Sequence, residues 1–164
     1  MTSNHAPFLV RPGGFAVTEV VDRVLSDWAY LSGQPAGVPA PGPADLPLEY
    51  AVRLSGPAHY LLVMRSTEAL GSAVAVASTG DPNAGGLGPD AFRELVNLVA
   101  GHLLTDCLDG GTELYQSFLP QASGPSDWPA SDPMGQALLL VENQPLEIRL
   151  WATQGAAGPG GSHA

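Results

Sequence analysis

The sequence predicts an α+β fold, in which helices pack on a mainly antiparallel sheet built of hairpins. Two observations predict it. Segments 48–64 and 136–152 each hold two apolar runs around a turn signal, which is typical of a β-hairpin. Three further segments, before and between these hairpins, place apolar residues at helical spacing. Because hairpins pair their strands antiparallel, the helices are expected to cover the resulting sheet rather than to connect parallel strands.

The first helix is predicted over residues 15–31, after a break at Pro12-Gly13-Gly14. The next segment, 32–47, is rich in Pro, Gly and Ala and predicts an extended or mobile loop. A single helix is too little to form a domain, so this loop is expected to lie within one domain. The apolar residues at helical spacing are Val17, Val20, Val21, Val24, Leu25, Trp28 and Leu31.

A strand is predicted over 48–54, where apolar and polar side chains alternate. Ser55-Gly56-Pro57 is a turn signal, and the apolar run 58–64 predicts the second strand of the hairpin. Leu48, Tyr50, Val52 and Leu54 would lie on one face of the first strand, with Glu49 and Arg53 on the other. Such alternation indicates a half-buried strand.

A second helix is predicted to follow, with Ser66 as its N-cap and Glu68 in its first turn. Its apolar side holds Ala69, Leu70, Ala73, Val74 and Ala77. The segment 81–88, DPNAGGLG, is expected to be a loop.

The third helix is predicted from Pro89, a favoured first-turn residue, to about Leu108, before Gly110-Gly111. Its core stripe would hold Phe92, Leu95, Val96, Val99, Leu103 and Cys107. Three polar residues occupy the opposite side at i, i+4 and i+7, within an arc of about 60°. They are Asp90, Glu94 and Asn97. Judged by residue type alone, such a face is most often simply solvated.

The remaining elements complete the expected sheet. Residues 112–119 predict a strand, 120–133 a Pro/Ser-rich loop, and 136–141 with 146–152 a hairpin around the turn 142–145. One domain over 15–152 is therefore expected, with a flexible N-terminus, 1–14, and a disordered tail, 153–164.

Composition excludes several classes of function. The net charge is −10, and no basic cluster is present, which argues against binding nucleic acid or an anionic membrane surface. No long apolar stretch predicts a transmembrane helix, and no signal peptide is evident, so a cytoplasmic location is expected. The single cysteine, Cys107, is expected to be a small core residue, and the four histidines show no metal-ligand spacing.

The segment D90-AFR-E94-LV-N97, followed after twenty-two residues by Pro120, resembles the motif of the CheC/CheX/FliY phosphatases. That motif reads Asp or Ser, three residues, Glu, two residues, Asn, twenty-two residues, Pro. CheC-type members usually carry two copies of it. The single copy in this chain favours the CheX type, and the expected order of helices and strands agrees with a CheX-like fold.

This resemblance implies a phosphatase that acts on the phosphoaspartate of a CheY-like response-regulator receiver. Asn97 would position the attacking water, and Glu94 would dock on the receiver's active-site lysine. Asp90 and Pro120 would support the helix. No cofactor of the protein's own is implied, because the Mg²⁺ would belong to the receiver. The resemblance also implies a homodimer formed through the sheet, for which strands 136–141 and 146–152 would offer an edge.

Two alternatives remain open from the sequence. The first alternative to the phosphatase is a non-catalytic module that binds either a receiver or a flagellar component. The second is a structural domain in which the match to the motif is accidental. Retention of both Glu94 and Asn97 favours the enzyme, because a module that only docks does not need the amide. The long segments 32–47 and 120–133 depart from the family pattern and would reshape the docking surface.

Overall fold

The computed structural model describes residues 17–35, 46–56, 59–106, 116–117 and 119–153. Several sequence predictions fall outside these residues. They are the break at 12–14, the flexible N-terminus, Cys107 in the core stripe, the helix end at 108–111, most of the loop 32–47 and all of the tail beyond Thr153. The domain bounds stay a prediction.

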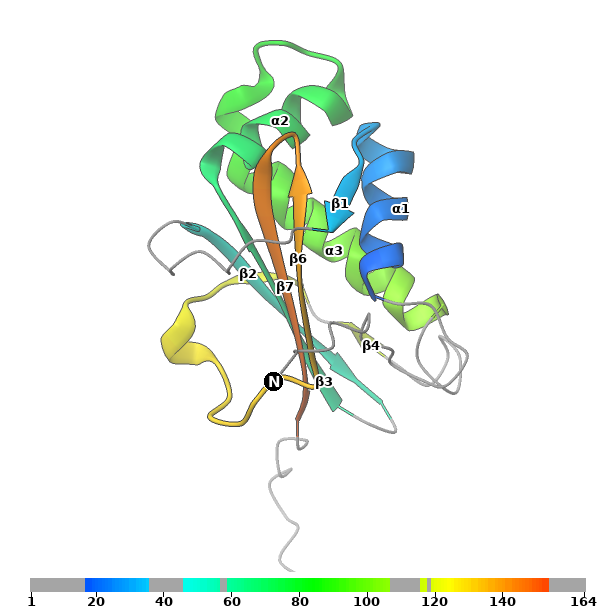
Figure 1. Ribbon diagram of the computed structural model, residues 1–164, viewed down its shortest axis with the longest axis vertical. Coiled ribbons are helices and arrows are strands. Elements are labelled where there is room, and N and C mark those ends of the chain that lie inside the picture. The colour runs from blue at the N-terminus through cyan, green and yellow to red at the C-terminus, as the bar shows by residue number, and fades with distance from the viewer. Residues whose placement is uncertain (1–16, 36–45, 57–58, 107–115, 118, 154–164) are drawn as a thin grey trace, which may run out of the picture.

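Helices and strands follow one another in the predicted order, with additional short elements (Figure 1). They are α1 (Val17–Ala29), β1 (Gly33–Pro35), β2 (Leu48–Ser55), β3 (His59–Ser66), α2 (Glu68–Thr79), the 3-10 helix η2 (Ala84–Leu87), α3 (Gly88–Asp106), β4 (Gln116–Ser117), β5 (Gln121–Ala122), the 3-10 helix η4 (Pro125–Asp127), β6 (Gly135–Val141) and β7 (Gln144–Thr153).

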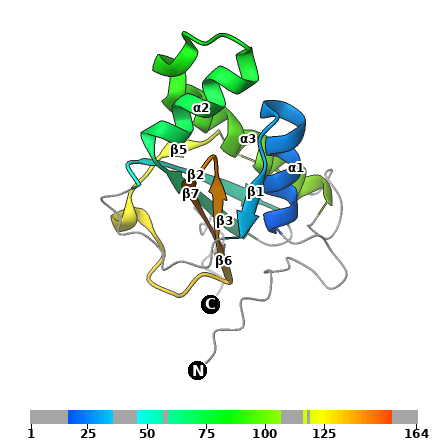
Figure 2. The ribbon, with the colours of Figure 1, turned by 45° about the horizontal axis from the view of Figure 1, so that its top comes forward.

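The strands form one sheet in the order β1-β6-β7-β3-β2-β4, and β5 also pairs with β2. Every one of these pairs is antiparallel. The three α-helices lie on one side of the sheet (Figure 2). The predicted α+β fold with helices on a mainly antiparallel sheet is therefore confirmed.

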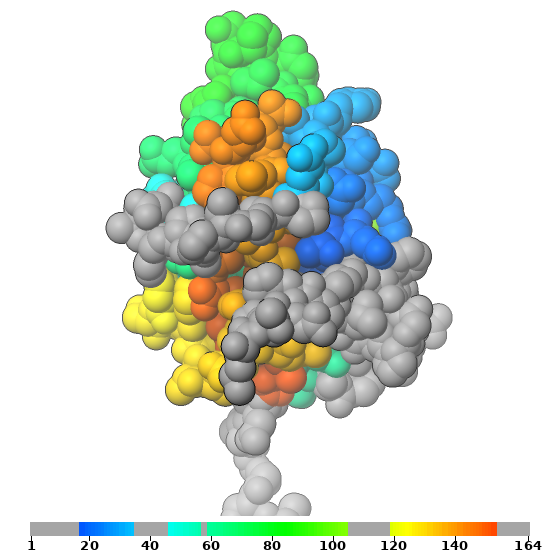
Figure 3. All heavy atoms as spheres, in the orientation of Figure 1, coloured from blue at the N-terminus to red at the C-terminus, as the bar shows by residue number. Residues whose placement is uncertain are grey.

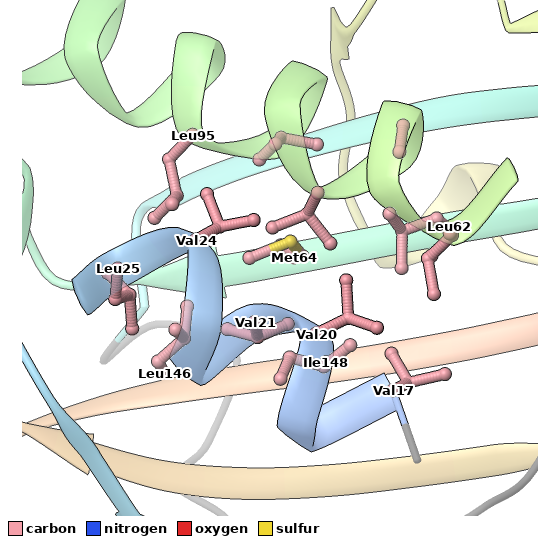
Figure 4. Close-up of a cluster of buried hydrophobic side chains, with 14 of the residues drawn as sticks. Val17, Val20, Val21, Val24, Leu25, Leu62, Met64, Leu95, Leu146 and Ile148 are labelled. Atoms are coloured by element: carbon pink, nitrogen blue, oxygen red, sulfur yellow. The ribbon is translucent and has the colours of Figure 1, made fainter. Parts of the chain in front are cut away.

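The hydrophobic core lies between this face of the sheet and the helices α1 and α3 (Figure 4). From α1, Val24 points toward Leu95 of α3, and Val20 lies near Ile148 of β7. Met64 of β3 and Ile148 of β7 are directly paired neighbours on the facing strands, and both are fully buried. Burial of such side chains stabilises the fold by roughly 1.5–3 kcal/mol each.

The end of α1 and the strand after it differ from the prediction. α1 stops at Ala29 because Tyr30 adopts a left-handed conformation, with φ of 54°. β1 then pairs with β6, and the Gly33 N–H donates to Asp22 Oδ1 at 2.8 Å. The expectation that the loop begins at residue 32 is therefore wrong at its start. A strand of three residues is too short for alternation to reveal it.

The first hairpin confirms both predicted strands, although β3 continues to Ser66. Ser66 is consequently not the N-cap of α2. It is fully buried, and its hydroxyl donates to Pro145 O at 2.7 Å. Thr67 is the cap instead, because its Oγ1 accepts from Leu70 N at 3.1 Å. α2 ends at Gly80, whose φ is 70°.

The second hairpin is tighter than predicted. Glu142 and Asn143 have φ of 50° and 60°, which matches the two-residue turn that suits the twist of antiparallel strands. Pro145 is therefore part of β7 rather than of the turn.

This arrangement corrects one of the two strands predicted as an edge for a homodimer, 146–152, whereas residues 136–138 of the other pair with no described strand on their outer side. β7 pairs with β3 on one side and β6 on the other, so it is an interior strand. β6 in turn pairs with β1 over residues 139–141. The homodimer itself stays a prediction.

The outer face of the sheet, opposite the helices, carries a buried row of charges. Glu49, Arg65 and Glu147 lie side by side on β2, β3 and β7. Arg65 and Glu147 are only 2% and 3% exposed, and Arg65 Nη2 donates to Glu147 Oε2 at 2.8 Å. Arg149 pairs with the other oxygen of Glu147. A row of this kind was not expected for a half-buried strand.

A segment predicted as a loop, 120–133, covers these charges. It contains β5 and η4, and it brings Trp128 over the row. The guanidinium groups of Arg65 and Arg149 stack on the Trp128 ring, with their Cζ atoms 5.0 and 4.2 Å from its centre. Its Nε1 donates to Glu49 Oε2 at 3.1 Å, and its ring lies 5.7 Å from that of Trp151. Trp128 and Trp151 therefore lie together on the outer face of the sheet.

Two glycines set how α2 meets the beginning of α3. A Cβ on Gly88 would lie 2.9 Å from both Gly71 C and Ser72 N, which are backbone atoms. A Cβ on Gly71 would lie 3.1 Å from Gly88 O. The two backbones are thus in direct contact, and Ser72 Oγ donates to Gly85 O at 3.0 Å. This contact holds η2 and the first turn of α3 against α2.

We expect Gly88→Ala to lower the free energy of unfolding by about 1–3 kcal/mol, because the new methyl group overlaps backbone that cannot turn aside. Gly86→Ala is the matched control, since a Cβ there meets nothing within 4 Å. Urea unfolding followed by circular dichroism measures both. Equal stability of the two variants would contradict the tight backbone contact.

We expect Glu147→Gln to cost about 3 kcal/mol of stability, because it leaves Arg65 charged and buried without a carboxylate. Glu142→Gln, in the exposed turn next to the same strand, should change stability by less than about 0.5 kcal/mol. Urea unfolding measures the free energy of unfolding of both variants. If Glu147→Gln lowers it by less than about 1 kcal/mol, the buried pair contributes little to stability.

Candidate functional site

The rotation of α3 about its axis is set by its apolar stripe. Five side chains that are at most 1% exposed face α1 and the sheet, so the opposite side of the helix points outward. They are Phe92, Leu95, Val96, Val99 and Leu103, as predicted. The Phe92 ring lies 6.1 Å from that of Tyr50 on β2, which ties the first turns of α3 to the sheet.

The motif residues of α3 lie on this outward side. Asp90 and Glu94 are exposed, and Asn97 is partly buried. Among the described residues, none of the three side chains has a hydrogen bond or an ion pair. Their polar groups are therefore available to a molecule that approaches the helix from outside. We call Asp90, Glu94, Asn97 and Gly101 the α3 face.

Pro120 does not lie on α3. It is buried in the segment between β4 and β5, both of which pair with β2. α3 packs on β2 and also contacts β4. The segment that holds Pro120 thus borders the strand under α3. The predicted strand 112–119 is described only at Gln116–Ser117 and at Leu119, which is exposed and outside any strand.

The two small residues after the motif differ in their surroundings. Ala100 is fully buried in the core, so it offers no open surface. Gly101 is exposed, and a Cβ there would meet no described atom within 4 Å. Glycine inside a helix costs about 1 kcal/mol relative to alanine, and packing within the described part of the chain does not require it here.

Other candidate groups carry no comparable arrangement. His102 is exposed on α3, and His59 Nδ1 lies 3.0 Å from Ser55 Oγ across the first hairpin. Residues 85–88, expected as a loop, form the end of η2 and the start of α3. In the described ranges no three His, Cys, Asp or Glu side chains gather closely enough to hold a metal ion. None of the helices described is both long and apolar enough to cross a membrane.

A comparison with protein-family models finds no match, and a comparison with curated proteins finds none either. Solved structures do match. The chemotaxis protein CheX from Desulfovibrio desulfuricans superposes with a TM-score of 0.60 at 16% identity, over 84% of this chain and 96% of that one. The fold is CheX-like.

Two further structures agree. A chain of the CheX–CheY–BeF3–Mg complex from Borrelia burgdorferi has a TM-score of 0.57 at 11% identity, over 84% of this chain and 96% of its own length. A CheC-like superfamily protein from Shewanella sp. PV-4 has a TM-score of 0.56 at 16% identity, over 82% of this chain and 94% of its own length. These identities are low, so the similarity establishes the fold alone.

One exposed residue near the motif has no counterpart in the sequence prediction. Leu87, the last residue of η2, is 55% exposed although it is a large apolar side chain. It stands three residues before Asp90 and therefore just ahead of the α3 face. Sequence patterns could not reveal it, because 81–88 shows no periodicity and reads as a turn.

We expect Gly101→Ala to raise the free energy of unfolding by about 0.5–1 kcal/mol, because alanine favours the helix and the methyl group meets no described neighbour. Gly80→Ala should instead destabilise, since Gly80 has equal space but a φ of 70°. Thermal and urea unfolding measure both, and a destabilised Gly101→Ala would show that the glycine serves packing within the chain.

Proposed function

We propose that this protein is a phosphatase of the phosphoaspartate of a CheY-like receiver domain, with Asn97 and Glu94 as its catalytic residues. The proposal is supported by one observation above all. In a chain with a CheX-like fold, the residues at the motif positions of α3 are outward-facing, and their side chains have no described partner. A chain of a CheX–CheY–BeF3–Mg complex being among the fold neighbours supports a CheY-like partner.

Asn97 would act on the water molecule. Its amide oxygen accepts a hydrogen bond from water and holds it in line with the phosphorus, opposite the bond to the aspartyl oxygen. Attack forms a new P–O bond and breaks the bond to the aspartyl oxygen. The products are the aspartate carboxylate and dihydrogen phosphate, and the water supplies both protons of the latter. Phosphoryl transfer needs little covalent help, so positioning is a sufficient role.

The amide suits this position better than a carboxylate. A neutral group adds no negative charge beside the phosphoryl oxygens, whereas Asp would repel them. Partial burial of Asn97 at the edge of the helix also limits the number of orientations that its side chain adopts. The Mg²⁺ that neutralises phosphoryl charge would belong to the receiver.

Glu94 would bind the partner. It lies one helical turn before Asn97, on the exposed side of α3, and would accept hydrogen bonds from the receiver's active-site lysine. A lysine engaged in this way fixes the distance between the two proteins near the phosphoryl group. The contact is local, which matters because the net charge of −10 gives no long-range attraction for an acidic partner.

Asp90 and Pro120 are assigned supporting roles. Asp90 lies in the first turn of α3, where a carboxylate complements the helix dipole. Pro120 lies in the segment that borders β2, under the helix. Neither is expected to touch the phosphoryl group.

We expect wild type to accelerate loss of phosphate from a receiver of its own organism, and Asn97→Ala to lower kcat by at least about 100-fold. Glu94→Ala should raise KM by about ten-fold or more, because a charge-assisted hydrogen bond to the partner is lost. Glu19→Ala, an exposed glutamate on α1, is the matched control and should match wild type. The assay follows the receiver after phosphorylation by phosphoramidate.

Two results would refute parts of this proposal. If wild type leaves every receiver at its intrinsic rate of phosphate loss, the protein is not a phosphatase. If wild type is active and Asn97→Ala retains full kcat, the water is positioned by another group. Binding of a receiver without hydrolysis would favour the non-catalytic module instead.

A further inference from the structure

We propose that Leu87 is an apolar anchor that extends the α3 face and binds a hydrophobic patch beside the active site of the receiver. This inference rests on the proposed function, since it names a further contact to the same partner. It would make Leu87 a determinant of affinity and of receiver choice, outside the residues of the motif.

Leu87 projects from the same side of the helix axis as the α3 face. η2 continues directly into α3, because Gly88 already has helical φ and ψ of −53° and −49°. Leu87 precedes Glu94 by seven residues, which is about two turns and brings the two to within roughly 20° around the helix axis. Leu87, Asp90, Glu94 and Asn97 thus fall within an arc of about 80° on the outward side. A partner that contacts Glu94 and Asn97 also meets Leu87.

The backbone that carries Leu87 is held rigidly. The backbone of η2 and the first turn of α3 is held by the contact between Gly88 and Gly71 and by the bond from Ser72 Oγ to Gly85 O. Ala84, at the start of η2, is buried, and its N–H donates to Asp81 O at 3.1 Å. An apolar side chain held outward on a fixed backbone loses little conformational freedom on binding.

The junction of η2 and α3, where Leu87 lies, is at one end of the molecule. α2 and η2 form one end of the protein and project beyond the sheet (Figure 3). Leu87, a large apolar residue, leaves 55% of its surface exposed there. Asp90 and Glu94 are carboxylates on the same side, so a complementary surface is apolar near Leu87 and positively charged near Glu94. The net charge of −10 disfavours a second copy of this chain as the occupant, whereas a receiver docked by its lysine on Glu94 would lie over this end of α3.

The test compares Leu87→Ser with Leu87→Met, and uses Met134→Ser as the matched control. Met134 is also an exposed apolar residue, 43% exposed, but it precedes β6 and lies away from α3. Receivers of the source organism are loaded with BeF3⁻ and Mg²⁺, and Kd is measured by titration calorimetry. Steady-state dephosphorylation gives kcat and KM for the same variants.

We expect Leu87→Ser to raise Kd and KM by about ten-fold, with kcat at saturation unchanged, because a buried leucine contact is lost while the water and phosphorus keep their geometry. Leu87→Met should keep the Kd of wild type, because methionine is also a large apolar side chain. Met134→Ser should not alter the Kd. Asn97→Ala should lose kcat but keep its Kd, which separates the two roles.

Three outcomes would overturn the inference. If Leu87→Ser binds the receiver as tightly as wild type, Leu87 is no anchor, and the proposed phosphatase activity is untouched. If Leu87→Ser changes self-association of the chain rather than receiver binding, a second copy is the occupant. If wild type binds no receiver at all, the proposed function fails and this inference with it.

Discussion

The structure depends on the packing of α3 against the sheet. Its buried stripe, from Phe92 to Leu103, determines the rotation of the helix, because turning it by even a quarter would expose several large apolar side chains and cost several kcal/mol. The same constraint directs Asp90, Glu94 and Asn97 outward. Their positions are therefore a consequence of core packing, although none of them takes part in it. A surface positioned in this way is rigid, which suits a helix that must place one amide precisely.

The sheet under α3 is covered on both faces, and the two faces are stabilised differently. The helix side is apolar, whereas the outer side buries Glu49, Arg65 and Glu147 beneath Trp128. Arg65 Nε and Nη1 have no hydrogen-bond partner among the described residues, so the stacked Trp128 ring is the contact that accompanies this charge. A buried ion pair contributes little net stability but is costly to break, and it favours one register of the strands. The pair joins β3 to β7, and β3 pairs in turn with β2, on which α3 packs.

The covering segment also links the outer face to the neighbourhood of the α3 face. The chain that contains Trp128 begins at Pro120, and β5 within it pairs with β2 at Tyr50 and Ala51. Glu49, which directly precedes Tyr50 in β2, accepts hydrogen bonds from Ser123 Oγ and Trp128 Nε1. One carboxylate thus holds the segment that borders β2. In physical terms, the long Pro/Ser-rich insertion serves as a second layer over the sheet.

The elements whose pattern is local could be predicted from the sequence. Alternation in β2 and β7, the apolar stripe of α3 and the spacing from Asp90 to Pro120 were all readable, because each depends on neighbours within a few turns or on counting residues. The features that depend on contacts between distant residues could be seen only in the folded structure. Ser66 lies in a strand instead of capping α2 because Pro145 O, 79 positions away, accepts its hydroxyl. Arg65 and Glu147 are buried because their strands pair, and Leu87 projects because Gly71 and Gly88 meet. These contacts join distant parts of the chain, and no local periodicity encodes them.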